Sequence, residues 1–465
     1  MNENYLLDNE KSIELFQQIK NNPIIDYHSH ISAKKIAENT PFLNITDIWL
    51  KEDHYKWRAM RLDGVHEDLC TGNASDYAKF NAWARTSSKI FRNPLYHWNK
   101  IELFKYFNIK KDLNHETCDE IWNHTNELLL ESNFRPQELL IKSNVEILCT
   151  TDDPADSLEF HEEIKKIQNF EIKIYPTFRP DSAFAFNGAN KFNDWLANLR
   201  KITNIDINNL KNFLEALKKR HDEFNAMGCR LSDHGLNYIK FVECSDVQAN
   251  NIFSKLLSYN DLDQDQINLW NNYLLIKFCE WNYDKKWVTM LHIGALRNNN
   301  DKINASIGMD SGCDSIGDYS HANGINKFLN ELNNRNKLYK IILFNSNPKD
   351  SYPFATIAGN FFENGIRGKI QYGPPWWFLD SINGIKDQFN IYSNTGIAEN
   401  YVGMVTDSRS FLSFTRHDFF RKIICNIYSK DMNQGLITAS NESIVNSLNM
   451  IFYKNAFEYF NWEHK

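Results

Sequence analysis

The chain of 465 residues is long enough to bury a large core, either as one elaborated barrel or as two or three ordinary domains. Its 42% hydrophobic and 24% charged residues are ordinary for a globular protein, and a formal charge of -7 without basic runs argues against a nucleic-acid or membrane partner. We expect a cytoplasmic protein with reduced cysteines, because residues 1–20 lack the apolar core of a signal peptide and no Cys-x-x-Cys pair occurs.

The first predicted element is a short apolar strand over residues 24–30, which carries His28 and His30. Side chains on an extended strand alternate between its faces, so the two imidazoles point the same way and can share one divalent cation. A histidine pair at this spacing also fits core packing or a capping role. A third ligand from elsewhere in the chain would favour the metal site.

A long interval, residues 32–144, follows this strand. Apolar residues recur at helical spacing over 77–91, 95–107 and 116–130, which predicts a helical subdomain inserted beside the first strand. Inside it, the run from Asp53 to Arg61 is dense in titratable and aromatic groups. A solvated amphipathic helix with Trp57 and Met60 facing the core would explain this run without a function.

Seven further apolar runs stop abruptly at polar residues, as strands do. They cover residues 145–150, 172–178, 229–232, 287–291, 340–344, 368–372 and 402–406. Segments of helical character lie between them at 154–168, 208–227, 264–284, 322–335 and 354–364. Eight strands alternating with helices predict an α/β fold, a (β/α)8 barrel. We divide it into the N-terminal segment with the first strand (1–31), the helical insertion (32–144), and the rest of the barrel with C-terminal helices (145–465).

In such a barrel the chemistry gathers at the carboxyl ends of the strands. The titratable residues at the predicted strand ends are His28, His30, Arg179, His234, His292, Asp407 and Arg409. Asp407, at the end of the last strand, is a carboxylate that could complete a metal site with His28 and His30. Two imidazoles and one carboxylate hold a divalent ion with open positions, and both zinc and manganese accept this set.

Several motifs together resemble the uronate isomerase (glucuronate isomerase) family of the amidohydrolase superfamily. They lie at residues 25–30, 53–61, 178–181, 229–234, 291–297, 375–378 and 406–411. The resemblance covers essentially the whole chain. It implies reversible aldose-ketose isomerisation of the hexuronates D-glucuronate to D-fructuronate and D-galacturonate to D-tagaturonate.

The resemblance also implies roles for four residues. Asp407 matches the family's base, and Arg409 the group that meets the C2 and C3 hydroxyls. Tyr55 matches a tyrosine near the C1 carbonyl, where a phenol can give and recover a proton. Arg179 matches the guanidinium that binds the uronate carboxylate. The metal, with zinc expected and manganese an alternative, would bind the C6 carboxylate and C5 hydroxyl.

Several other residues are expected in the pocket, and some of them also fit a purely structural role. His54, His292 and Trp376 are expected to line the pocket, although His292 also fits a satisfied core histidine. Arg179 also fits an ordinary ion pair with Asp181. For His234 a structural role, hydrogen-bonded to the neighbouring Asp233, is slightly preferred. We also expect a homo-oligomer.

Two other functions are compatible with some of the same residues. A metal-dependent hydrolase of the same superfamily could use the same histidines and aspartate to activate water. Against it, the fourth strand ends at Asp233-His234 without a lysine that could be carboxylated to bridge two metals. A non-catalytic binder of sugar acids is the third hypothesis, and it does not explain a complete set of base, metal ligands and proton carrier.

Overall fold

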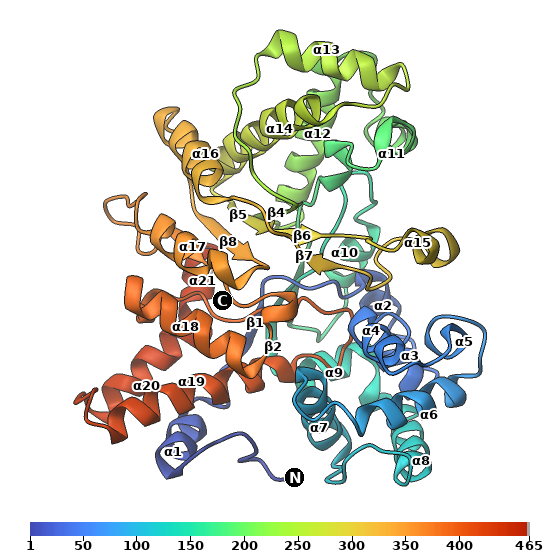
Figure 1. Cartoon of the computed structure of the whole chain (residues 1–465), viewed down its shortest axis with the longest axis vertical. Coiled ribbons are helices and arrows are strands. Elements are labelled where there is room, and N and C mark those ends of the chain that lie inside the picture. The colour runs from blue at the N-terminus through green and yellow to red at the C-terminus, as the bar shows by residue number, and fades with distance from the viewer. Residues whose placement is uncertain (463–465) are drawn as a thin grey trace.

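The strands of the computed structural model, which describes residues 1–462, form an incomplete parallel barrel (Figure 1). One sheet has the order β1-β2-β3, and its strands are β1 (Ile24–Asp26), β2 (Val145–Cys149) and β3 (Lys173–Tyr175). The other sheet has the order β4-β5-β8-β9, and its strands are β4 (Leu231–Leu236), β5 (Val288–Ile293), β8 (Ile341–Asn345) and β9 (Ile370–Tyr372). Phe178 joins the two sheets, since it bridges in parallel to Asp152 and to Ser232. The predicted α/β barrel is confirmed.

The eighth predicted strand is wrong as a regular strand, although residues 402–406 occupy its place. Positive φ angles at Gly403 (86°) and Asp407 (46°) interrupt the extended backbone. The Asp26 carboxylate accepts the backbone N–H of Thr406 at 2.9 Å, which replaces a ladder bond. The N–H of Asp407 then donates to the carbonyl of His28 at 3.1 Å. The segment therefore lies against the end of β1 and brings the two ends of the chain together.

Other strand boundaries also differ from the prediction: β3 and β9 are shorter than expected, and three further boundaries bear on the site. β1 ends at Asp26, so His28 and His30 lie beyond the strand. β4 continues through Leu236 and β5 through Ile293, so the residues expected after these strands lie inside them. These residues pair in parallel with neighbouring strands, which extends the ladder past the point where the sequence turns polar.

The interval between β1 and β2 is helical, as predicted, and lies at the lower right of Figure 1. Its helices are α2 (Ala33–Glu38), α3 (Ile45–Trp49), α4 (His54–Leu62), α5 (Glu67–Cys70), α6 (Asp76–Ser87), α7 (Pro94–Phe107), α8 (Cys118–Leu129) and α9 (Pro136–Lys142). Local signals set the helix starts: Asn93 caps α7, whose first residue is proline. The division into a barrel and an inserted subdomain stays a prediction.

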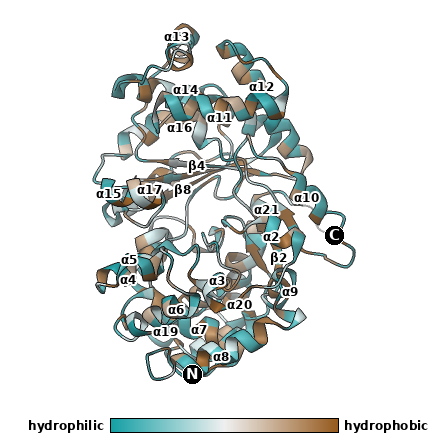
Figure 2. Cartoon of the chain, turned by 90° about the vertical axis from the view of Figure 1, so that its right-hand side faces the viewer, coloured by the Kyte–Doolittle hydropathy of each residue, from teal (hydrophilic) through white to brown (hydrophobic). Residues whose placement is uncertain are grey.

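The crossover helices surround the strands. They are α10 (Glu159–Ile164), α11 (Gly188–Thr203), α12 (Leu210–Ala226), α13 (Asp246–Leu257), α14 (Gln264–Lys285), α16 (Ala322–Asn334), α17 (Ser351–Ala358) and α18 (Ile382–Thr395). Of these, α11, α13 and α18 were not predicted. Figure 2 shows β4 and β8 in the middle of the molecule with α14 and α16 outside them. A two-stranded pair, β6 (Ala295–Leu296) and β7 (Ser315–Ile316), with α15 (Asp301–Ile307) between them, follows β5.

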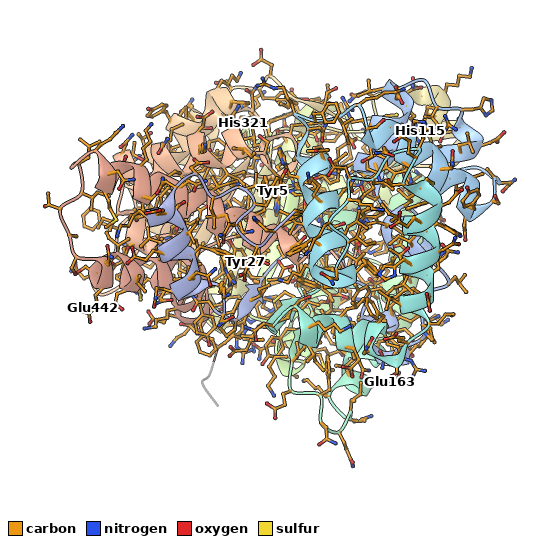
Figure 3. The ribbon with its side chains drawn as sticks, turned by 90° about the horizontal axis from the view of Figure 1, so that it is seen from below. Tyr5, Tyr27, His115, Glu163, His321 and Glu442 are labelled. Carbon is orange, nitrogen blue, oxygen red and sulfur yellow. The ribbon has the colours of Figure 1, made fainter. Side chains whose placement is uncertain are left out.

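The terminal helices are α1 (Glu10–Ile19), α19 (Thr415–Asn433), α20 (Asn441–Asn449) and α21 (Asn455–Tyr459). Tyr27 is fully buried and packs against Phe460, with ring centroids 4.9 Å apart, so the end of the chain fills the barrel interior. Figure 3 shows Tyr27 near the middle of the molecule and Glu442 of α20 at its edge. Within residues 1–462, none of the helices combines the length and apolar character needed to cross a bilayer.

Candidate active site

A cavity of about 580 Å³ lies at the carboxyl ends of the barrel strands. The predicted site residues that line it are His28, His30, His54, Arg179, His292, Trp376, Asp407 and Arg409. These residues come from both ends of the chain, from the insertion and from the intervening strands. The structure therefore brings eight of the nine predicted site residues to one cavity.

Asp407 contacts both histidines of the His-x-His pair. Its Oδ1 lies 3.1 Å from Nε2 of His28 and 3.1 Å from Nε2 of His30. The two ring centroids are 5.3 Å apart, so all three donor atoms can reach one ion. The left-handed backbone at Asp407, uncommon for a non-glycine residue, turns its carboxylate toward the histidines.

The charges of these groups suit a cation. Burial opposes the negative charge of Asp407, but hydrogen bonds from His28 and His30 outweigh it and hold the pKa of Asp407 well below its ordinary value. Burial lowers the pKa of His30 to about 4, so its imidazole is neutral at pH 7 and can donate a lone pair. Two imidazoles and a carboxylate fit zinc or manganese.

Asp233 is a site residue that the sequence interpretation missed. It is fully buried, and its Oδ1 lies 2.6 Å from Nδ1 of His292, while its Oδ2 lies 2.9 Å from Nη1 of Arg179. The same Oδ2 is 3.9 Å from Nδ1 of His28. Burial opposes its charge, but Arg179 and the two histidines hold the pKa of Asp233 well below its usual range. His28, Asp233 and His292 thus form a second group with the donor spacing of a metal site.

Strand alternation explains why Asp233 is in the site and His234 is not. In β4, Leu231 joins the apolar cluster inside the barrel and Leu236 joins the cluster outside it. Asp233 shares the inner face with Leu231, and His234 shares the outer face with Leu236. His234 lies 2.9 Å from the hydroxyl of Ser232, so its expected bond to Asp233 is absent from the described chain.

Arg179 is both paired and placed at the pocket. Its Nε donates to Asp181 at 2.9 Å, the ion pair that the simpler interpretation anticipated. Its Nη1 pairs with Asp233. The Arg179 side chain is 20% exposed and lines the cavity. The pair therefore fixes the guanidinium without removing it from the pocket.

Tyr55 lies in an adjoining cavity that shares His54, Asp407 and Arg409 with the first. Asp53 caps α4 by accepting the backbone N–H of Tyr55 at 3.0 Å, which places the tyrosine in the first turn. Its ring stacks on His54 with centroids 4.5 Å apart. Burial raises the pKa of Tyr55 well above its ordinary value, so the phenol is protonated at pH 7.

The remaining predicted residues, Arg409, Trp376 and His292, line the larger cavity. Nη1 of Arg409 donates to Nδ1 of His54 at 3.3 Å. Trp376 is 4% exposed and meets the ring of His292 at a centroid distance of 5.0 Å. His292 in turn stacks on Phe344 at 4.2 Å, and its Nε2 is buried without a hydrogen-bond partner in the described chain. These contacts place the imidazoles of His54 and His292 beside the candidate metal ligands.

The chain is similar to proteins of known description along its whole length. Residues 1–460 match the family model described as glucuronate isomerase. A uronate isomerase of Cellvibrio japonicus is 40% identical, with 99% of this chain and 98% of that protein covered. One of Bacteroides thetaiotaomicron is 42% identical, with 99% of each covered.

Solved structures agree with this. The crystal structure of uronate isomerase from Thermotoga maritima superposes with a TM-score of 0.93 at 35% identity, and covers 99% of both chains. The glucuronate isomerase of Caulobacter crescentus has a TM-score of 0.92 at 24% identity, over 100% of this chain and 98% of that one, which shows the shared fold.

Proposed function

Because this chain belongs to the glucuronate isomerase family, we propose that it interconverts D-glucuronate with D-fructuronate and D-galacturonate with D-tagaturonate, using one divalent metal ion. The reaction is an aldose-ketose isomerisation, in which a proton leaves C2 and a proton is added to C1 while the carbonyl moves from C1 to C2. The observation that carries the site assignment is the convergence of His28, His30 and Asp407 at one cavity.

The metal would be held by His28, His30 and Asp407, with zinc expected and manganese an alternative. When bound, it would supply positive charge that binds and orients substrate oxygens. The donor types, the short contacts to Asp407 and the neutral His30 support this assignment.

Asp407 would act as the base that takes the C2 proton. Both of its histidine contacts use Oδ1, and Oδ2 has no hydrogen bond within the described chain. Its low pKa keeps it ionised at pH 7, as a base must be before it accepts a proton. The same carboxyl would then return the proton to C1.

Three residues would bind the substrate oxygens or exchange protons with them. Tyr55, a protonated phenol, would donate to the C1 oxygen and recover a proton from O2. Arg409 would stabilise the enediolate through the C2 and C3 oxygens, since a guanidinium is a strong donor to developing negative charge. Arg179 would bind the substrate carboxylate through Nη2, because Nε and Nη1 already meet aspartates. His54, His292 and Trp376 would shape the pocket.

The hydrolase alternative is disfavoured by the environment of Asp233. The fourth strand offers this aspartate in place of a lysine, and both of its oxygens already contact Arg179 and His292. A protein that only binds sugar acids would have no use for the free Oδ2 of Asp407. This carboxylate lines the same cavity as the protonated phenol of Tyr55.

We extend the proposal to a cytoplasmic location and a homo-oligomer. All eight cysteines are unpaired thiols and most are buried, which suits a reducing compartment. Light scattering on the purified protein measures the oligomeric state.

The test combines metal analysis with an exchange assay. The protein, reconstituted with zinc or manganese, is incubated with D-glucuronate in deuterated buffer. We expect a ketose by NMR, with deuterium entering at C1 when the proton carried by the base exchanges with solvent. Hydrolysis of generic esters or lactams without ketose formation would favour the hydrolase. Tight uronate binding without turnover at any metal loading would favour the binder.

A further inference from the structure

A second large cavity, of about 750 Å³, lies between α1, α7 and α19. Its lining includes Asn22, two residues before β1, and Asn144, directly before β2. It therefore lies at the amino ends of the strands, opposite the metal ligands. In Figure 1 this region is at the bottom of the molecule, near the N-terminus. None of the residues assigned to the uronate site lines it.

Basic side chains outnumber acidic ones around this cavity. The basic residues are Lys20, Lys105, Lys142, Arg421 and Lys422. The carboxylates are Glu3 and Asp418. Lys20 lies 2.8 Å from Glu3, and Lys105 lies 2.6 Å from Asp418. Arg421 and Lys422 share these two carboxylates with Lys20 and Lys105, so five basic side chains of the lining face two acidic ones.

Lys422 is 4% exposed, and its one hydrogen bond within the described chain is to the carbonyl of Glu3, at 2.7 Å. Its ammonium also lies 5.0 Å from the ring centroid of Phe16. Arg421 is 2% exposed, donates to the carbonyl of Pro23 at 3.0 Å, and lies 3.9 Å from a carboxylate oxygen of Asp418. Burying cations that must share their carboxylates with other cations is costly, which indicates that an anion accompanies them.

The cavity also has apolar walls, formed by Phe16, Ile101 and Phe104. Phe16 belongs to α1, and the other two belong to α7. An inorganic anion would leave these walls in contact with water. A ligand that joins an oxyanion to an apolar body matches both the charged and the apolar parts of the lining.

We propose that this cavity is a binding site for a small organic oxyanion, a carboxylate or a phosphate ester on an apolar body, separate from the uronate site. Arg421 and Lys422 would bind the oxyanion, and the aromatic residues of α1 and α7 would cover its body. This site lies beyond the isomerase activity and does not depend on it.

The experiment uses the full chain loaded with metal and the fluorescent probe 8-anilinonaphthalene-1-sulfonate, an aryl oxyanion. We expect saturable binding that Lys422→Met weakens at least tenfold, since methionine keeps the buried volume and removes the charge. Lys105→Met, at a less buried position of the same cavity, should weaken binding several-fold. Lys111→Met, an exposed lysine outside the cavity, should leave it unchanged. If the Lys422 variant does not fold, the Lys105 variant decides.

Displacement by phenyl phosphate or by phenylacetate then identifies the preferred oxyanion. Burial lowers the pKa of Lys422 to about 8, so probe affinity should fall as the pH rises above this value. Equal affinity of the probe for the wild type and both cavity variants would overturn the proposal. So would displacement of the probe by D-glucuronate, or binding that is lost as the protein concentration rises, because a second copy of the chain would then occupy the cavity.

Discussion

Arg179, which follows β3, and Asp233 of β4 form an ion pair with Nη1 and Oδ2 2.9 Å apart. Asp233 has no solvent exposure, and it also bonds His292. Asp233→Asn would leave the guanidinium less compensated, so we expect the metal-free protein to lose about 3 kcal/mol of unfolding free energy. Urea unfolding measures this loss, with the exposed Asp265→Asn as control. A loss as small as the control's would show that the pair contributes nothing to stability.

Asp407→Asn should abolish isomerisation while leaving the fold intact. The amide keeps the volume but cannot accept the C2 proton, so we expect kcat to fall at least about a thousandfold. Metal content and circular dichroism are measured on the same sample, because Asp407 is also a proposed ligand. A metal-bound variant that keeps more than a few per cent of activity would show that another group is the base.

Arg179→Lys should mainly raise KM. Two of the three guanidinium nitrogens are held by Asp181 and Asp233, and a single ammonium cannot hold these partners and bind substrate as well. We expect KM for D-glucuronate to rise about tenfold, or about 1.4 kcal/mol, with kcat little changed. The exposed Arg85→Lys serves as control. An effect confined to kcat would place Arg179 in the chemistry.

Tyr55→Phe keeps the ring that stacks on His54 and removes only the hydroxyl. We expect kcat to fall about a hundredfold with a small change in KM, because a proton carrier contributes to the transition state more than to binding. Steady-state kinetics measures both constants, and Tyr77→Phe in α6 is the matched control. An unchanged kcat would remove Tyr55 from the proton transfer.

A buried histidine should make stability depend on pH. His221 lies 3.0 Å from Asn282, and burial lowers its pKa to about 3. Between about pH 6.5 and 3 the unfolded chain binds a proton there that the folded chain does not, so the free energy of unfolding decreases as the pH falls. The contribution is up to about 1.4 kcal/mol per pH unit.

His221→Gln keeps an amide donor for Asn282 and cannot titrate. We therefore expect a shallower decline of the free energy of unfolding from pH 6.5 to 4.5, measured by urea unfolding of the metal-free protein. His115→Gln, at an exposed position, should keep the wild-type decline. Identical slopes for both variants and the wild type would mean that His221 is not a source of the acid sensitivity.

The sequence was sufficient to predict the barrel and the meeting of His28, His30 and Asp407, because apolar runs that end in polar residues are marks of barrel strands. It was not sufficient for the local geometry. The alternation argument assumed that the histidines lie on a strand, but β1 ends at Asp26. Their shared direction comes from bonds beyond the strand, such as that from the N–H of His30 to the carbonyl of Ser408.

Asp233 escaped prediction because the strand end was placed too early. With β4 ending at residue 232, Asp233 and His234 would both be loop residues, and Asp233 was expected only as a hydrogen-bond partner of His234. Once β4 runs through Leu236, alternation places the aspartate inside and the histidine outside. Helices α11 and α13 were missed because the intervals that hold them were treated as single crossovers.

The position of the proposed metal ligands along the chain has a consequence for synthesis. His28 and Asp407 are 379 residues apart, so the site cannot assemble until nearly the whole polypeptide has left the ribosome. A product that stops short of residue 407 would contain two histidines with no carboxylate to hold them, and we expect it to remain without its ion. Loading of the proposed metal would therefore come late in the life of each molecule, once the whole barrel has formed.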